Sequence, residues 1–414
     1  MRRVGIIWLT ITASSGLLAQ DAVGQGATPA PQSRIAQWDS LREKKSESLR
    51  APERKGLEKA LYEIREQHVL DRLAAGWRGF HPTFGGLTTG SGLALGTEWR
   101  HERLWSGVLD VRVAGRASFK AYQKYELQFA MTRLRNEHLF LDFTTTYRNY
   151  PQEDYFGLGP ESRREDRSNF RLEDTSFLGT MGVRGWRKRL TLAARGGLVT
   201  INVGPGTDSR FASTEKVFTA ASTPGLVRQP GYYQFGAFAH MDWRDVAGNP
   251  RSGGRYLAEW TTFGDRRWSL FSFRRYDLEV QQYAPFFNSR RVIAFRAKTS
   301  LTDTSPGQVV PFYMMPTLGG SEDLRGYREF RFRDKNLMVY NLEYRWEVFS
   351  GLDMAVFGDA GKVFSRRTDF SVEDLEGAYG IGFRFNQAQS VFLRIDVAKS
   401  HEGIRFFFKF GHVF

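Results

Sequence analysis

The chain has 414 residues and a formal net charge of +14, with 41% apolar residues, 14% aromatic residues, 42 glycines and no cysteine. The lack of cysteine excludes disulfide bonds and thiolate metal sites. The low apolar share, combined with many aromatics and glycines, argues against a string of ordinary soluble domains, and the positive charge suits either nucleic acid or anionic lipid headgroups.

Residues 1–19 have the pattern of a secretory signal peptide. Met1-Arg2-Arg3 gives a basic start, the apolar run VGIIWLTITASSGLLA follows, and small residues precede the expected cleavage near Ala19. The run is short for a transmembrane anchor, and no later stretch is long and apolar enough to cross a bilayer as a helix. We therefore expect export through the inner membrane with a cleaved signal peptide.

Residues 20–76 are expected to form a polar linker and a periplasmic helical arm. The linker QDAVGQGATPAPQS has the composition of a disordered segment. Helices are expected over residues 34–75, interrupted near Pro52, and an apolar stripe recurs at helical spacing in Leu57, Leu61 and Ile64. We favour a solvated arm that lies under or plugs a barrel, and the alternative is an arm that binds a periplasmic partner.

From Trp77 to Phe414 the hydrophobic period changes from helical to two. In KYELQFAMT, for example, one face carries Tyr125, Leu127, Phe129 and Met131, and the other carries Lys124, Glu126 and Gln128. Sixteen such segments begin near residues 77, 91, 104, 121, 137, 171, 188, 231, 254, 268, 290, 336, 351, 376, 390 and 404. The pattern predicts an all-β fold, a sixteen-stranded antiparallel transmembrane β-barrel with a polar lumen and an apolar outer face.

The lengths of the connections support this strand count. The long connections at 150–170, 204–230, 302–335 and 361–375 follow the fifth, seventh, eleventh and thirteenth predicted strands, and all four numbers are odd. The short turns HERL, RNEH and FNQAQS fall after even-numbered strands. Long loops on one side and short turns on the other are typical of outer-membrane barrels.

Five late motifs occur in a familiar order: LGGSEDLRGY, NLEYRWEV, VFGDAGKVF, AYGIGFRF and the terminal FFFKFGHVF. In this order they resemble the BamA-type bacterial surface antigen superfamily of insertases and translocases, over roughly residues 77–414. The resemblance implies a barrel in the bacterial outer membrane, in contact with outer-membrane lipids and lipopolysaccharide. It also implies unfolded outer-membrane proteins as clients.

In that family the sixth extracellular loop folds into the lumen, where its Arg-Gly-aromatic tip meets acidic residues of the wall. The resemblance assigns this loop latch to Gly319, Gly320, Leu324, Arg325, Gly326 and Tyr327, and its lumen partners to Glu343 and Asp359. Strand alternation places Glu343 on the polar face, and a guanidinium inside a barrel requires carboxylate partners. The alternative is a solvated loop with an incidental arginine.

The C-terminal end resembles the signal by which barrel proteins are recognised for assembly, formed here by Phe406, Phe408, Phe410, Gly411 and Phe414. A last strand also needs an aromatic outer face, whether or not it is recognised for assembly.

One feature departs from the family. Members carry periplasmic POTRA domains ahead of the barrel, whereas residues 20–76 show no strand pattern, so the resemblance implies a reduced member without such domains.

Catalytic and nucleotide-binding motifs are missing from the sequence. The histidines are scattered without His-Glu-x-x-His, no Gly-x-Ser-x-Gly occurs, and the glycine-rich GGLTTGSGLALG lacks the lysine of a phosphate loop. Basic residues are spread along the barrel segments rather than clustered with aromatics as nucleic-acid binding requires. We expect no enzyme activity, no cofactor, no metal and no nucleic-acid partner.

The expected function is outer-membrane protein assembly or transport, acting through the latch and through a seam between the first and last strands. Two alternatives stay open: a passive pore or structural barrel, and a lipid-handling barrel with a separate periplasmic partner.

Overall fold

The computed structural model describes residues 38, 40–42, 44, 77–88, 90–387, 390–411 and 414. The predicted signal peptide lies outside the described residues, as does most of the predicted arm, of which Trp38, Ser40, Leu41, Arg42 and Lys44 are helical. The chain has two compact units, residues 1–55 and 56–414, and all the strands belong to the second. Within the described part of the chain, no helix has both the length and the apolar character needed to cross a membrane.

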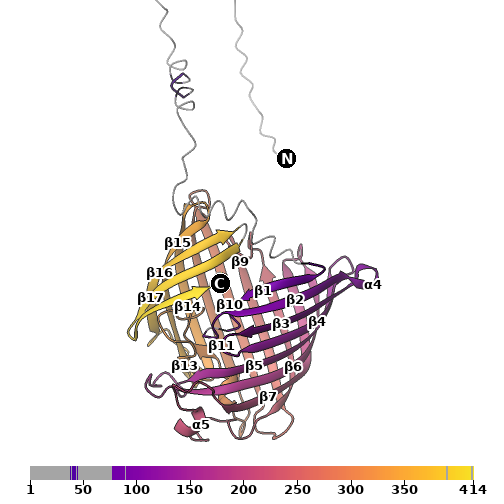
Figure 1. Ribbon diagram of the computed structural model, residues 1–414, viewed down its shortest axis with the longest axis vertical. Helices are drawn as coiled ribbons and strands as arrows, with labels where there is room; N and C mark the ends of the chain where they lie inside the picture. Colours follow the sequence, from indigo (N-terminus) through magenta and orange to yellow (C-terminus); the bar gives the residue numbers. More distant parts are fainter. Residues whose placement is uncertain are drawn as a thin grey trace, which may run out of the picture. The chain divides into compact units, whose positions relative to one another are not determined.

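Sixteen strands form one antiparallel sheet in simple chain order, which confirms the predicted barrel (Figure 1). The strands are β1 (Phe80–Gly85), β2 (Ala94–Arg103), β3 (Leu109–Ser118), β4 (Gln123–Leu134), β5 (Leu139–Tyr155), β6 (Ser168–Gly185), β7 (Leu190–Pro205), β8 (Gly231–Asp242), β9 (Gly253–Asp265), β10 (Phe273–Phe286), β11 (Arg291–Asp303), β14 (Asn336–Phe349), β15 (Leu352–Phe364), β16 (Glu376–Gln387), β17 (Ser390–Ser400) and β18 (Gly403–Lys409). Each strand pairs with the next by hydrogen bonds, and β1 and β18 form the two ends of the sheet.

The period of two in the sequence becomes an inner and an outer face. On β4, Tyr125 and Phe129 are exposed on the outside, as a lipid-facing surface requires. Glu126 points to the opposite face, where it forms ion pairs with Arg116 of β3 at 2.8 Å and with Lys124 at 3.0 Å. Polar side chains therefore satisfy one another across neighbouring strands inside the barrel.

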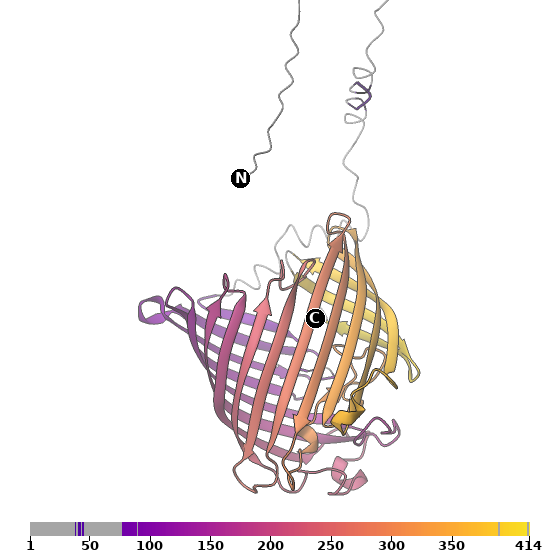
Figure 2. The same cartoon turned by 180° about the vertical axis from the view of Figure 1, so that it is seen from behind.

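The four longest connections lie between β5 and β6, β7 and β8, β11 and β14, and β15 and β16, as predicted, and all are at the same end of the barrel (Figure 2). Short elements occur in the connections: α4 (Leu104–Gly107), α5 (Thr214–Val217), η1 (Phe312–Met314) and η2 (Arg367–Asp369), together with a two-stranded sheet of β12 (Thr317–Leu318) and β13 (Phe332–Arg333). The β11–β14 connection, which contains η1, β12 and β13, is called the lumen loop below.

Two strands begin five residues later than the sequence pattern predicts, the largest such difference, each because a turn intervenes. The third strand was expected near 104, but Arg103, Trp105 and Ser106 adopt left-handed backbone conformations that end β2 and reverse the chain. The tenth was expected near 268. There the Asp265 carboxylate accepts four backbone N–H groups from the following six residues and holds a tight turn until Phe273.

The lumen loop is anchored at its base by an aromatic cluster at the long-loop end of the barrel. Phe312 of η1 is fully buried, and its ring lies 4.8 Å from that of Tyr155 and 4.9 Å from that of Phe170, centroid to centroid. Arg333 of β13 donates a hydrogen bond to the carbonyl of Phe312 at 2.9 Å. This packing fixes where the loop starts and ends, and so directs its tip toward the inner wall.

Candidate functional site

The tip of the lumen loop turns on three glycines that adopt backbone conformations rarely open to other residues. Gly319, Gly320 and Gly326 have φ angles of +119°, +90° and +104°. At Gly326 the backbone also lies against the wall, because an added Cβ would sit 2.9 Å from the Cβ of Ala378 on β16. The Gly326 carbonyl accepts a hydrogen bond of 2.8 Å from the Ser400 hydroxyl of β17. A larger residue at Gly326 would push the tip off the wall.

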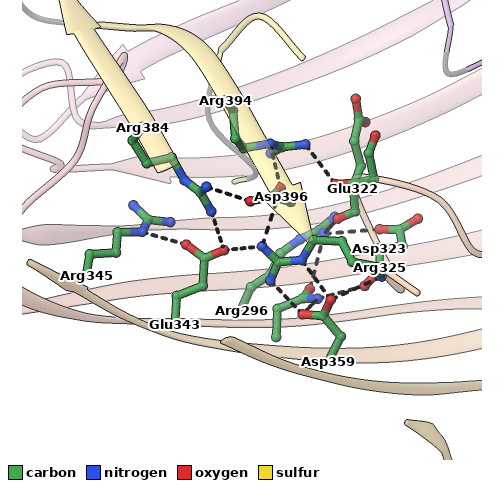
Figure 3. A network of polar contacts seen from close by, with 12 residues as sticks. Arg296, Glu322, Asp323, Arg325, Glu343, Arg345, Asp359, Arg384, Arg394 and Asp396 are labelled. Carbon is green, nitrogen blue, oxygen red and sulfur yellow. Dashed lines mark hydrogen bonds and ion pairs between the residues drawn. The ribbon is translucent and has the colours of Figure 1, made fainter. Parts of the chain in front are cut away.

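Arg325, next to Gly326, is fully buried and faces two carboxylates (Figure 3). Its Nε and Nη2 donate to the two oxygens of Asp359 on β15, at 2.8 and 2.7 Å, and its backbone N–H donates to Asp359 at 3.1 Å. Its Nη1 donates to Glu343 on β14. The guanidinium also lies 3.4 Å from the ring centroid of Phe357, a cation–π contact. Paired hydrogen bonds of this kind fix orientation as well as position.

The carboxylates that hold Arg325 are shared with three arginines of the wall. Glu343 accepts hydrogen bonds from Arg345 at 2.7 Å and from Arg384 at 3.2 Å. Asp396 of β17 pairs with Arg384 at 2.6 Å and with Arg394 at 3.0 Å, and lies 3.9 Å from Nη1 of Arg325. The latch cluster is therefore defined by Arg325, Glu343, Arg345, Asp359, Arg384, Arg394 and Asp396.

The charges of the latch cluster are closely matched. Four guanidinium groups and three carboxylates leave one excess positive charge. Burial disfavours the charged form of Arg325, but the neighbouring charges of Asp359 and Glu343 outweigh this and raise the pKa of its guanidinium. Arg325 is therefore charged at any physiological pH. Buried ion pairs thus join the loop tip to the inner wall.

Leu324 and Tyr327, on either side of the Arg-Gly pair, add apolar contacts to the latch. Both are fully buried, in a cluster with Leu318, Phe332, Leu337, Val339, Val363 and Ala378. The Tyr327 hydroxyl donates to Glu376 at 2.6 Å and lies 2.9 Å from Nδ1 of His401. The tip is thus held by ion pairs at its centre and by packing at its sides.

The residues of the predicted assembly signal lie in two different environments. Phe406, Phe408 and Phe410 are exposed on the outer face, where lipid would cover them. Gly411 follows with a φ angle of +90°. Phe414 does not share the outer face, because it is only 4% exposed and packs against Tyr283, Val292 and Ala294. These positions describe where the aromatics lie, and recognition for assembly stays a prediction.

Sequence reasoning named Arg325, Glu343 and Asp359 but missed Asp396 and the wall arginines. A signal for them exists in the alternation of LRIDV, which puts Arg394 and Asp396 on the polar face of one strand. No metal site accompanies the cluster: within the described residues, no three His, Cys, Asp or Glu side chains are grouped so that they could hold an ion.

Comparisons with solved structures support the fold. BamA from Haemophilus ducreyi, in a crystal structure lacking POTRA domains 1–3, is similar with a TM-score of 0.59 and 14% identity, over 90% of this chain and 81% of that chain. CdiB from Escherichia coli is similar with a TM-score of 0.54 and 12% identity, over 81% of this chain and 62% of that chain. At such identities the likeness concerns the barrel fold alone.

A search of curated proteins finds no match. The family comparison is more informative: the Omp85 superfamily domain matches residues 110–414, from the start of β3 through the lumen loop to the last residue. The matched range is well over half of the chain and contains the whole latch cluster. The chain therefore belongs to the Omp85 superfamily and is an outer-membrane β-barrel.

Proposed function

We propose that this barrel assists the insertion or translocation of proteins at the outer membrane, through the seam between β1 and β18. The observation that carries the proposal is that these two strands end the sheet without pairing with each other, within the part of the chain that the structure describes. Every other neighbouring pair in the sheet is joined by hydrogen bonds.

An unpaired strand edge in a membrane is energetically unfavourable. Backbone N–H and C=O groups that face lipid without partners cost several kcal/mol each. A strand of an incoming protein that pairs with the β18 edge would satisfy those groups, and the barrel would guide the strand into the bilayer. Unfolded outer-membrane proteins are the clients that present such strands.

The latch supports this role by keeping the lumen loop on the β14–β17 side of the wall, next to the seam. In BamA-type proteins, periplasmic domains capture clients before the barrel acts. We propose that residues 34–75 form a periplasmic arm that takes part in this step with a separate partner. Lipids and lipopolysaccharide would surround the exposed aromatic face of the barrel.

The test is to lock the seam chemically. The end of β1 meets the end of β18, because a Cβ added at Gly85 would lie 3.9 Å from the ring of Phe410. A variant with Phe84→Cys and Phe410→Cys, treated with a short thiol cross-linker, joins the two strands, and no native cysteine interferes. The matched control is Phe392→Cys with Phe410→Cys, since these rings lie 5.6 Å apart on the already paired β17–β18 side.

Each protein is placed in liposomes, and protease protection of an added unfolded outer-membrane protein is followed with time. The proposal requires the uncross-linked protein to accelerate folding over empty vesicles. It also requires the seam cross-link, and not the control cross-link, to abolish the acceleration. Equal rates of client folding with and without the seam cross-link would contradict the proposal. Solute flux through the same vesicles would then distinguish a passive pore from a closed structural barrel.

A further inference from the structure

The seam is not uniform along the height of the barrel. β1 runs toward the long-loop end and stops at Gly85, which meets Phe410 just after the turn-side end of β18. Because the two strands run in opposite directions, the first residues of β18 extend beyond the end of β1 on the long-loop side. The wall next to Gly403–Phe407 is therefore not completed by β1.

A cavity of about 700 Å³ lies beside this part of β18. Its lining includes residues 404–407 of β18, together with Gly90, Lys120 and Tyr122 from the first two long-side connections. Residues 328–330 of the lumen loop contribute to the same cavity. We call this cavity the seam pocket.

The seam pocket is rich in positive charge. Its basic lining residues are Lys120, Arg167, Arg210, Arg328 and Arg405, and its acidic lining residues are Asp154, Asp208 and Glu329. Two of the acids are already paired, Asp154 with Arg167 at 2.8 Å and Asp208 with Arg210 at 2.7 Å. The basic residues therefore outnumber the acids available to them.

Two of the arginines have no close acidic partner. Within the described residues, neither Arg328 nor Arg405 forms a hydrogen bond or an ion pair through its guanidinium, and Nε of Arg405 is buried without a partner. Glu402, an acid that acts electrostatically on both arginines, is already paired with Arg331 at 2.5 Å. A buried N–H that no group accepts is unfavourable, so the pocket favours an incoming acceptor.

Like charges in the pocket also repel one another. Arg164 and Arg167 act electrostatically on both Arg328 and Arg405. Burial and the positive charges of Arg167 and Arg164 lower the pKa of Arg328. An anion bound between the guanidinium groups would relieve this repulsion. A phosphate group fits best, because guanidinium groups bind its oxygens with paired hydrogen bonds.

The apolar rim of the pocket indicates where the phosphate comes from. Ile404 and Phe406 alternate with Arg405 and line the same pocket, yet they are 62% and 66% exposed on the lipid-facing side. A lipid with an anionic headgroup would place its acyl chains along these side chains and its phosphate against the arginines. A free anion would gain nothing from the apolar rim.

We propose that the seam pocket binds the phosphate group of an anionic membrane lipid, with Arg328 and Arg405 as its ligands. The lipid then fills the part of the wall that β1 leaves open. This inference concerns lipid binding by the barrel and does not depend on insertase activity.

The test measures lipid retention on the purified full-length protein by native mass spectrometry. The probes are phosphatidic acid, phosphatidylcholine as the lipid with a neutralised phosphate, and inorganic phosphate alone. Arg328→Gln with Arg405→Gln removes the two ligands. The matched control, Arg135→Gln with Arg187→Gln, removes the same charge from exposed short turns at the other end. Heat-dependent gel mobility shows which variants are folded.

We expect the wild type and the control to bind phosphatidic acid equally, and the Arg328/Arg405 variant to bind about tenfold more weakly or worse. If that variant does not fold, Arg328→Lys with Arg405→Lys keeps the charge but not the paired hydrogen bonds and should bind with intermediate affinity. Equal loss in the control would mean a non-specific charge effect and would overturn the site. Inorganic phosphate that displaces the lipid at equal concentration would overturn its assignment to a membrane lipid.

Discussion

Replacing Arg325 by methionine is expected to release the lumen loop from the wall without unfolding the barrel. Methionine keeps much of the length and apolar contact of arginine but removes the cation. Removing one partner of a buried ion pair costs about 3–5 kcal/mol, because the remaining charge stays buried without compensation. The contacts that Glu343 and Asp359 keep after the substitution determine where in this range the cost falls.

Glu343 keeps Arg345 and Arg384 when Arg325 is removed, so most of the cost comes from Asp359. Asp359 keeps the amide of Asn341, at 2.8 Å, and, while the loop stays docked, the backbone N–H of residue 325, at 3.1 Å. The latch cluster also loses its excess positive charge, which offsets part of the penalty. We therefore expect the low end, about 3 kcal/mol, which makes the open loop roughly a hundredfold more populated.

The assay labels a single cysteine introduced at Ser321, a fully buried loop residue, with a membrane-impermeant maleimide. The labelling rate reports how often the tip leaves the wall. The matched control is Arg345→Met, which removes a partner of the same Glu343 but belongs to β14 rather than to the loop. Labelling of Arg325→Met that is no faster than labelling of Arg345→Met would refute the view that Arg325 holds the loop.

Three further predictions use the same structure. Tyr327→Phe removes one charge-assisted hydrogen bond and should raise Ser321→Cys labelling about tenfold, measured as above. Gly326→Ala should raise it further, since a methyl group at this φ angle displaces the tip from the wall; labelling as slow as that of the parent would contradict the close approach. The hydrogen bond from Arg210 holds the pKa of Asp208 at about 2, below its ordinary 3.8. A depressed carboxyl pKa stabilises the fold fully above pH 3.8 and less as the pH falls toward 2, so pepsin cleavage of the β7–β8 connection should rise over that window in the wild type. At pH 3.8 the Asp208→Asn variant should be cleaved faster than the wild type. Its cleavage should not show the additional increase that protonation of Asp208 causes in the wild type between pH 3.8 and 2.

The barrel was predictable because two independent sequence features agree. Alternation gives the strands, and the odd numbering of the long connections gives the side on which they lie. Local turn chemistry was harder to foresee. Left-handed residues such as Trp105, and a single carboxylate such as Asp265 that accepts several N–H groups, shift a strand start by several residues. Between Asp265 and Phe273 the sequence has no glycine or proline to mark the turn.

The latch site shows a different limit. Arg325, Glu343 and Asp359 could be named because a short motif and two wall motifs occur in a familiar order. Asp396 and Arg384 lie on strands further along the chain, and alternation marks them only as lumen-facing. Many polar residues share that property, so which of them meet depends on strand register and on how far the loop enters the lumen. Those distances are set by tertiary packing and leave no local pattern.

Phe414 links the C-terminal end of the barrel to the arginines around the latch cluster. Its ring lies 5.3 Å from the guanidinium of Arg345 and 5.9 Å from that of Arg296, centroid to charge. Arg345 holds Glu343 of the latch cluster, and Arg296 pairs with Asp323 of the lumen loop at 3.0 Å.

Arg296 therefore contacts both the lumen loop and the C-terminal residue, whereas Arg345 contacts Phe414 directly and the loop only through Glu343. Each ordered segment restricts those arginines in the conformation that the other needs, so ordering one lowers the entropy lost by ordering the other. An outward-facing terminal aromatic would contact lipid and could not have this effect. The lumen loop should consequently dock fully only after β18 and the residues beyond it have taken their places, which makes the latch a late step in forming the barrel.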